Sequence, residues 1–262
     1  MSISDRDLFA IIEIVKEAGF LAKKMFDGTE VDKKFKSERD IVTEADEKVE
    51  QMLINRLGAI DKVPFLSEEF NPSTPLNSAC WVIDPIDGTT NFASKIFPFA
   101  ISVAHFNGNF IDTGVCYLPV TDELFYAQAG SGSFLNGKKI KVNDVSSLME
   151  CVAATGFADI THGLNKNTLE VFNSVIKKTR ALRRLGSAVV DLVYTACGKF
   201  AFFYEAGLHP WDVAAGSLIV KEAGGVVTDF NGGEKYITGK TIIASNRPMY
   251  NFIKNEIDEL YN

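Results

Sequence analysis

Residues 81–92 read Trp81-Val82-Ile83-Asp84-Pro85-Ile86-Asp87-Gly88-Thr89-Thr90-Asn91-Phe92. The apolar run at the start predicts a buried strand, and Pro85 and Gly88 predict a turn directly after it. The strand would deliver Asp84 at its end and Asp87 on the turn, so that two carboxylates converge on one point. Like charges held so close stay ionised only if a cation neutralises them, and Mg²⁺ prefers oxygen ligands. The stretch therefore predicts a metal site, to which the backbone carbonyl of Ile86 can add an oxygen.

The same stretch continues into a candidate anion-binding turn. Gly88-Thr89-Thr90 reads as the first turn of a helix, whose free backbone N–H groups favour an anion. A metal site beside a phosphate cradle is the combination that phosphoryl chemistry requires. The alternative is a surface turn of the type Asp-Pro-x-Asp-Gly, in which the two carboxylates cap backbone amides.

Two acidic residues elsewhere fit the same site. Glu68 follows a short apolar run, and Asp212 lies just after Pro210, near the start of a predicted helix. Taken singly, Glu68 fits a solvated loop acid, and Asp212 fits a first-turn acid that complements the helix dipole. Together with Asp84 and Asp87 they would supply four carboxylates, enough for two or three Mg²⁺ ions.

The composition narrows the class of protein. The chain has 262 residues and a formal net charge of −7, which argues against nucleic-acid binding through a broad basic surface. The cysteines form no Cys-x-x-Cys pair, which argues against a zinc site and favours a reducing cytoplasm. No signal peptide and no apolar run of the roughly 20 residues needed to span a bilayer are apparent, so we expect a cytoplasmic protein without membrane contact. The histidines show neither triad nor metal spacing; they are His105, His162 and His209.

Hydrophobic periodicity predicts helices and strands in layers, and hence an α/β (α+β layered) fold. The expected helices cover residues 4–26, 43–57, 167–178, 188–196, 211–223 and 249–260. The expected strands cover residues 80–83, 100–103, 110–117, 123–128, 152–154, 182–184, 200–204, 226–227 and 242–243. Residues 31–41 are expected to form a loop or short hairpin, and residues 130–133 a turn.

A boundary near residues 145 and 146 is predicted to divide the chain into two halves of one compact catalytic unit. Residues 1–145 would form an N-terminal α+β half that carries most of the metal ligands. Residues 146–262 would form a C-terminal α/β half that carries Asp212 and the residues on the substrate side.

Taken together, these motifs resemble the inositol monophosphatase family. Residues 81–92 are similar to its first signature, and residues 210–216, continuing through Glu222-Ala223-Gly224-Gly225, are similar to its second. Ser67-Glu68-Glu69 is similar to the family's glutamate motif, and Lys36 with residues 42–46 is similar to its N-terminal Lys…Val-Thr-x-Ala-Asp element. The similarity covers nearly the whole chain. It implies alternating layers of helix and sheet, an αβαβα sandwich as in inositol monophosphatase and fructose-1,6-bisphosphatase. It also implies that the protein forms a homodimer, which is usual in the family, and that lithium inhibits it, which is common there.

The resemblance also implies a set of metal ligands. Glu68, Asp84 and the Ile86 carbonyl would hold a first Mg²⁺ ion. Asp84, Asp87 and Asp212 would hold a second. A third, more weakly bound ion would contact Glu68 through a water molecule. Lys36 and Asp46 match positions near the metal ions.

Further residues would bind the substrate or take part in catalysis. By resemblance, the amides of Gly88 and Thr89 would bind phosphate, with Thr90 beside them. Glu68 and the Thr89 hydroxyl would orient the attacking water next to Asp84. Glu205, Asp212 and Ala188, the last within Gly186-Ser187-Ala188, would meet the alcohol part of the substrate. The stretch Thr155-Gly156-Phe157-Ala158 supplies no evident ligand, which leaves the substrate open.

The predicted function is Mg²⁺-dependent hydrolysis of a small phosphate monoester, above all inositol monophosphate, by metal-activated water without a phosphoenzyme. The alternatives within this class of phosphoric monoester hydrolases are fructose 1,6-bisphosphate, histidinol phosphate and 3′-phosphoadenosine 5′-phosphate. A different class is a regulatory protein that binds the transcription machinery, because Arg183-Arg184-Leu185-Gly186-Ser187-Ala188 resembles bacterial family members that do so. A solvated or dimer-edge arginine pair is the favoured interpretation of Arg183 and Arg184.

Overall fold

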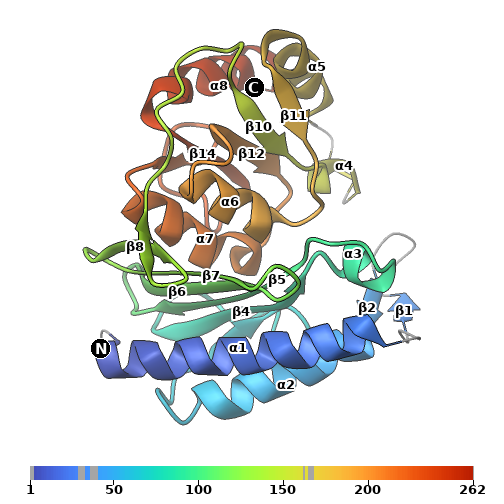
Figure 1. Cartoon of the computed structure of the whole chain (residues 1–262), viewed down its shortest axis with the longest axis vertical. Helices are drawn as coiled ribbons and strands as arrows, with labels where there is room; N and C mark the ends of the chain where they lie inside the picture. The colour runs from blue at the N-terminus through green and yellow to red at the C-terminus, as the bar shows by residue number, and fades with distance from the viewer. Residues whose placement is uncertain (1–2, 29–32, 36–40, 162, 165–167, 262) are drawn as a thin grey trace.

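Two β-sheets and three layers of helices alternate along the long axis of the molecule (Figure 1). The computed structural model describes residues 3–28, 33–35, 41–161, 163–164 and 168–261. The order of layers is helices α1 and α2, a seven-stranded sheet, helices α6 and α7, a five-stranded sheet, and helices α5 and α8. The αβαβα sandwich expected from the sequence is thereby confirmed.

The first layer consists of α1 (Asp5–Asp27) and α2 (Glu44–Leu57). Both begin at the caps expected from the sequence, because the Ser4 hydroxyl accepts a hydrogen bond from the Asp7 amide, and Thr43 and Asp46 form a reciprocal capping box. Apolar residues at helical spacing, such as Ile11 and Val15, face the sheet and are fully buried. These local signals therefore fix the face that each helix buries.

The seven-stranded sheet has the order β3-β4-β5-β6-β7-β8-β9. Only β3 and β4 are parallel, and all the other pairs are antiparallel. Along β4 the side chains alternate between two cores: Trp81 and Ile83 face α1 and α2, while Cys80 and Val82 face the middle helices. Burial on both faces explains why the strand reads as a continuous apolar run. The strands are β3 (Phe65–Ser67), β4 (Cys80–Asp87), β5 (Ala100–Phe106), β6 (Ile111–Leu118), β7 (Glu123–Gln128), β8 (Gly132–Leu135) and β9 (Lys138–Ile140).

The five-stranded sheet has the order β11-β10-β12-β14-β13. Its first three strands are parallel, and β14 and β13 join them in antiparallel pairing. Helices α5 and α8 cover its outer face (Figure 1). The elements are β10 (Val152–Thr155), β11 (Ala181–Arg183), β12 (Phe202–Ala206), β13 (Val226–Thr228), β14 (Thr241–Ser245), α4 (Ala158–Thr161), α5 (Leu169–Lys178) and α8 (Arg247–Leu260).

Helices α6 (Ala188–Ala196) and α7 (Pro210–Glu222) fill the space between the sheets. Eight of the nine residues of α6 and nine of the 13 residues of α7 are buried, so neither shows the polar face of a surface helix. Gly114 of β6 lets α7 approach the sheet closely, since a Cβ at this position would lie 2.9 Å from the Ala215 carbonyl oxygen. This close approach fixes where the first turn of α7 lies relative to the end of β4.

Several sequence predictions needed correction. Strands β8 and β9 were not predicted, and the turn expected over residues 130–133 gives way to β8 from Gly132 onward. The short helix α4 was also missed, because four residues hold too little periodicity. The short hairpin expected over residues 31–41, by contrast, agrees with the antiparallel pairing of β1 (Lys33–Phe35) and β2 (Ile41–Thr43). The division near residues 145 and 146 stays a prediction.

Among the described residues, no helix combines the length and the apolar character that crossing a bilayer requires.

Replacing Gly114 with alanine is expected to lower the free energy of unfolding by about 1–3 kcal/mol, because the added methyl group forces α7 away from the sheet. Thermal or urea unfolding of the metal-free protein measures the change. Gly28→Ala is the control, since Gly28 is exposed at the end of α1 with φ −66° and should shift stability by no more than about 0.5 kcal/mol. Equal stability of Gly114→Ala and wild type would contradict the close approach.

Candidate active site

Three aspartates from two elements meet at the carboxyl end of β4. One carboxylate oxygen from each of Asp84, Asp87 and Asp212 lies within 4.8 Å of the other two. The strand pairing explains how residues three apart reach the same side: Asp84 pairs with Ser102 and Asp87 with Ala100, so the β4–β5 register shifts by one residue between them. In a regular strand, side chains three residues apart point to opposite faces, and the bulge brings Asp84 and Asp87 to the same side. Asp212 arrives from the first turn of α7.

The aspartates destabilise one another's charged forms. Burial raises the pKa of Asp84 well above its usual range, and the charges of Glu68, Asp87 and Asp212 raise it further. Burial and the charge of Asp87 likewise raise the pKa of Asp212, against the hydrogen bond from the His209 amide. The pKa of Asp87 rises to about 6 through burial, although the Ser187 hydroxyl and Val189 amide donate to it. Buried, mutually repelling carboxylate oxygens are the donor set of a hard divalent cation.

Glu68 lies beside this cluster, on the loop that follows β3. Its charge acts on both Asp84 and Asp212, so Glu68 lies near them, although it is not one of the three carboxylates that meet within 4.8 Å. The loop is fixed by Glu50 of α2, which is fully buried and accepts hydrogen bonds from the Ser67 hydroxyl at 2.6 Å and the amides of Glu69 and Phe70 at 2.8 Å each. These three bonds flank Glu68 on both sides and hold its backbone in place. The sequence analysis did not single out Glu50.

Thr89 connects the aspartate turn to Asp46. The Thr89 hydroxyl lies 3.1 Å from Asp46 Oδ1 and 3.1 Å from the Ile86 carbonyl oxygen. Asp46 is fully buried, and its other oxygen accepts hydrogen bonds from the Thr43 amide and hydroxyl. Asp46 therefore orients the Thr89 side chain from the start of α2. Lys36, predicted to lie nearby, falls outside the described residues.

Gly88 sits where only glycine fits, just before the short helix α3 (Thr89–Ala93). Its φ of 97° is left-handed, and a Cβ would lie 3.3 Å from the Gly186 carbonyl oxygen. The helical turn expected at this point is present, with the Gly88 and Thr89 amides at its amino end and Thr90 exposed.

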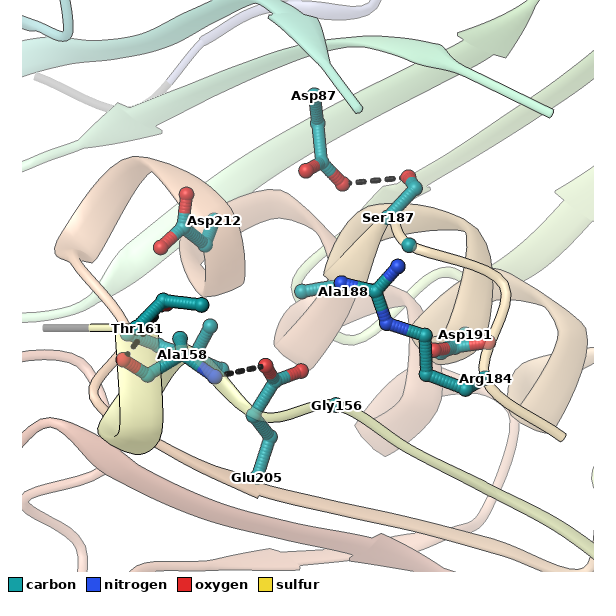
Figure 2. Close-up of a pocket in the computed structure, with 12 residues that line it drawn as sticks. Asp87, Gly156, Ala158, Thr161, Arg184, Ser187, Ala188, Asp191, Glu205 and Asp212 are labelled. Atoms are coloured by element: carbon teal, nitrogen blue, oxygen red, sulfur yellow. Dashed lines mark hydrogen bonds between the residues drawn. The ribbon is translucent and has the colours of Figure 1, made fainter. Parts of the chain in front are cut away.

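A cavity of about 180 Å³ opens next to the aspartates and is lined by Asp87, Asp212, Ala188 and Glu205 among others (Figure 2). Glu205 Oε1 accepts a hydrogen bond from the Ala158 amide at 3.1 Å. Burial raises the pKa of Glu205 to about 8, and the charge of Asp87 adds to this rise against that hydrogen bond. The structure thus brings the predicted residues Ala188 and Glu205 to the same cavity as the aspartate cluster.

Several residues of this cavity were not predicted to line it, among them Arg184 and Asp191, and Gly156 lines it from the stretch that supplied no evident ligand. Gly156 provides the space for Glu205, because a Cβ there would lie 2.1 Å from Glu205 Oε1. The glycine between β10 and α4 was visible in the sequence, but nothing local indicated which side chain it faces. His209 stacks on Trp211 with ring centroids 4.7 Å apart.

Comparisons with known proteins place this site in a family. The family model described as "Inositol monophosphatase family" matches residues 4–261. The chain belongs to the inositol monophosphatase family. The resemblance inferred from its motifs is thereby confirmed, and family membership identifies it as a phosphatase.

Similar proteins carry several names. A fructose-1,6-bisphosphatase/inositol-1-monophosphatase of Thermotoga maritima is 37% identical over 226 residues, 85% of this chain and 84% of that protein. The Nus factor SuhB of Escherichia coli is 34% identical over 253 residues, 95% of each chain. The crystal structure of the extragenic suppressor protein suhB from Bartonella henselae superposes with a TM-score of 0.89 at 33% identity, over 97% of this chain and 99% of that one.

The pKa shifts in the site predict that the metal-free phosphatase loses stability as the pH rises. The folded state keeps protons on Asp87, with a pKa of about 6, and on Glu205, with a pKa of about 8, which the unfolded chain releases near their ordinary values of 3.8 and 4.5. Their neutral forms therefore stabilise the fold at low pH, and this contribution is lost between about pH 4 and pH 8. Melting temperatures in EDTA across this range measure the loss.

Asp87→Asn is the matched variant, since it removes one titrating group while keeping the shape of the side chain. Its melting temperature in EDTA should depend less on pH than that of wild type. Added Mg²⁺ should raise the wild-type melting temperature more at pH 8 than at pH 5, because a bound cation favours the ionised carboxylates. A pH dependence identical in wild type and Asp87→Asn would contradict the assignment.

Proposed function

We propose that this phosphatase hydrolyses a small polyol phosphate, above all inositol monophosphate, with Mg²⁺ as its cofactor. The observation that carries the proposal is the adjacency of two features: the cluster of Asp84, Asp87 and Asp212, and the cavity that holds Glu205. The first suits a divalent cation, and the second offers hydrogen-bond acceptors to an alcohol. A phosphate ester of a polyol requires both.

We assign two or three Mg²⁺ ions to the carboxylates. Glu68, Asp84 and the Ile86 carbonyl would hold one, Asp84, Asp87 and Asp212 a second, and Glu68 through water a third. Bound Mg²⁺ would lower the pKa of a water molecule and neutralise charge on the phosphate oxygens. The raised pKa values of Asp84 and Asp212 support this assignment, because a bound cation would offset the repulsion that disfavours their ionised forms.

The attacking water would be oriented by Glu68 and Thr89. Asp46 and the Ile86 carbonyl are both acceptors within reach of the Thr89 hydroxyl, so its proton points toward one of them. The lone pairs of the Thr89 oxygen are then free to accept a hydrogen bond from water, and Glu68 can accept a second. The amides of Gly88 and Thr89, with Thr90 beside them, would bind the phosphate group.

The alcohol part of the substrate would enter the cavity. There Glu205 and Asp212 offer carboxylate oxygens, and the backbone at Ala188 offers a further polar contact. Glu205 is the residue best suited to bind a substrate hydroxyl, because the Ala158 amide donates to only one of its two oxygens and the other can accept from the substrate.

Several finer expectations accompany this function: homodimer formation, inhibition by lithium and a cytoplasmic location. Fructose 1,6-bisphosphate, histidinol phosphate and 3′-phosphoadenosine 5′-phosphate stay alternative substrates, and contact with the transcription machinery stays an alternative role. Arg183 and Arg184 are both exposed, and Arg184 also lines the cavity.

Asp212→Asn is expected to lower the rate of Mg²⁺-dependent phosphate release from inositol 1-phosphate by about 10³-fold or more, because a charged metal ligand is lost at the point of reaction. Asparagine can still accept the hydrogen bond of 2.7 Å from the His209 amide, so α7 keeps its cap and the fold should persist. Asp84→Asn should behave alike. The exposed Asp5→Asn is the control, with wild-type activity expected. Phosphate release that continues in EDTA would overturn the function.

Glu50→Gln is expected to raise the Mg²⁺ concentration for half-maximal activity severalfold. The amide group of glutamine replaces one acceptor oxygen with a donor, which then faces a hydroxyl or amide donor of the Glu68 loop. Steady-state activity titrated with Mg²⁺ measures the shift, and activity should recover at high Mg²⁺. Glu44→Gln, on the exposed side of α2, should match wild type. If the Mg²⁺ concentration for half-maximal activity is the same in Glu50→Gln and wild type, Glu50 does not position Glu68.

A further inference from the structure

Asp191 is a buried carboxylate in the cavity wall that the proposed reaction does not use. It lies in the first turn of α6, is 1% exposed and lines the cavity beside Glu205. Its Oδ1 atom has no hydrogen-bond partner among the described residues. Buried polar atoms are nearly always paired, and an unpaired one destabilises the fold, so such an atom in a binding cavity calls for a ligand donor.

The surroundings of Asp191 are acidic. Burial raises the pKa of Asp191 well above the usual range, the charges of Glu205 and Asp87 raise it further, and the charge of Arg184 opposes the rise. The Arg184 guanidinium lies over Gly186, where a Cβ would be 3.1 Å from Nη1, and it leaves Asp191 Oδ1 without a hydrogen bond. Figure 2 shows the Arg184 side chain beside Asp191, with the Glu205 carboxylate in the same space.

We propose that Asp191 accepts a hydrogen bond from a substrate hydroxyl and, with Glu205, selects esters whose alcohol part carries at least two free hydroxyl groups. This inference rests on the proposed function and names its substrate class. Asp191 acts as a specificity-determining residue: it is on α6, whereas Glu205 is on β12, so the two acceptors reach the substrate from different elements.

The unpaired Asp191 Oδ1 favours a hydroxyl donor over a second phosphate group. Asp87, Asp191, Glu205 and Asp212 all line the cavity, and the guanidinium of Arg184 is the one cation among the lining residues described. A second phosphate on the substrate would bring acceptor oxygens, and no donor, to the unpaired Oδ1 of Asp191. A purely apolar alcohol part would leave Asp191 Oδ1 buried and unpaired. A neutral polyol avoids both costs.

The test compares two esters in steady-state kinetics with Mg²⁺. Inositol 1-phosphate has five free hydroxyls, and 4-nitrophenyl phosphate has none. In Asp191→Ala, the ratio of kcat/KM for inositol 1-phosphate to that for 4-nitrophenyl phosphate should fall about tenfold or more, because a buried acceptor oxygen is lost. Asp191→Asn keeps one acceptor oxygen, so its ratio should lie between those of Asp191→Ala and wild type, and it supplies the result if the alanine variant does not fold.

Asp112→Asn is the matched control. Asp112 is also buried and its Oδ2 also lacks a partner, but it lies on β6 and does not line this cavity. Its ratio should stay within twofold of wild type. An unchanged ratio in both Asp191 variants, while wild type hydrolyses both esters, would overturn the role of Asp191 and leave the phosphatase function intact. Wild type that hydrolyses neither ester with Mg²⁺ would overturn the proposed function and this inference with it.

Discussion

Electrostatic repulsion among buried carboxylates is the constraint around which this molecule is built. Asp84, Asp87 and Asp212 sit closer together than free carboxylates would, with Glu68 facing them. The fold opposes the repulsion with local donors: Ser187 and Val189 bond to Asp87, the Ile86 amide bonds to Asp84, and the His209 amide bonds to Asp212. These donors offset part of the repulsion without removing it, so the three aspartates keep the oxygen donor set that divalent cations prefer.

The middle helices link this constraint to the rest of the fold. Helix α7 brings Asp212, and α6 brings Ser187 at its cap and Asp191 in its first turn. Both helices are buried between the sheets, and glycines set how closely they pack: Gly114 admits α7 to the sheet, and a Cβ at Gly216 would lie 2.7 Å from a Leu192 side-chain atom. The positions of the acidic groups therefore depend on packing tens of residues away from them.

The sequence predicted those parts of the fold and site whose signals are local. The caps of α1 and α2, the apolar run of β4 and the turn with Asp84 and Asp87 each lie within a dozen residues. Residues whose role depends on distant partners were not predictable: Gly156 matters only because Glu205 faces it, and Asp191 reads as an ordinary first-turn acid. Strands β8 and β9 were missed because they are short and lie at the edge of the sheet, where burial imposes little pattern.

The distance along the chain between Asp87 and Asp212 has a consequence for biosynthesis. The residues between them include most of the first sheet, all of α6 and three strands of the second sheet. A nascent chain on the ribosome can therefore complete the helices α1 and α2 and the turn with both aspartates, yet it has no full set of ligands until α7 has emerged and docked. Contacts of such long sequence separation form late in folding. Under the proposed assignment of metal ligands, hydrolysis would therefore await the docking of α7.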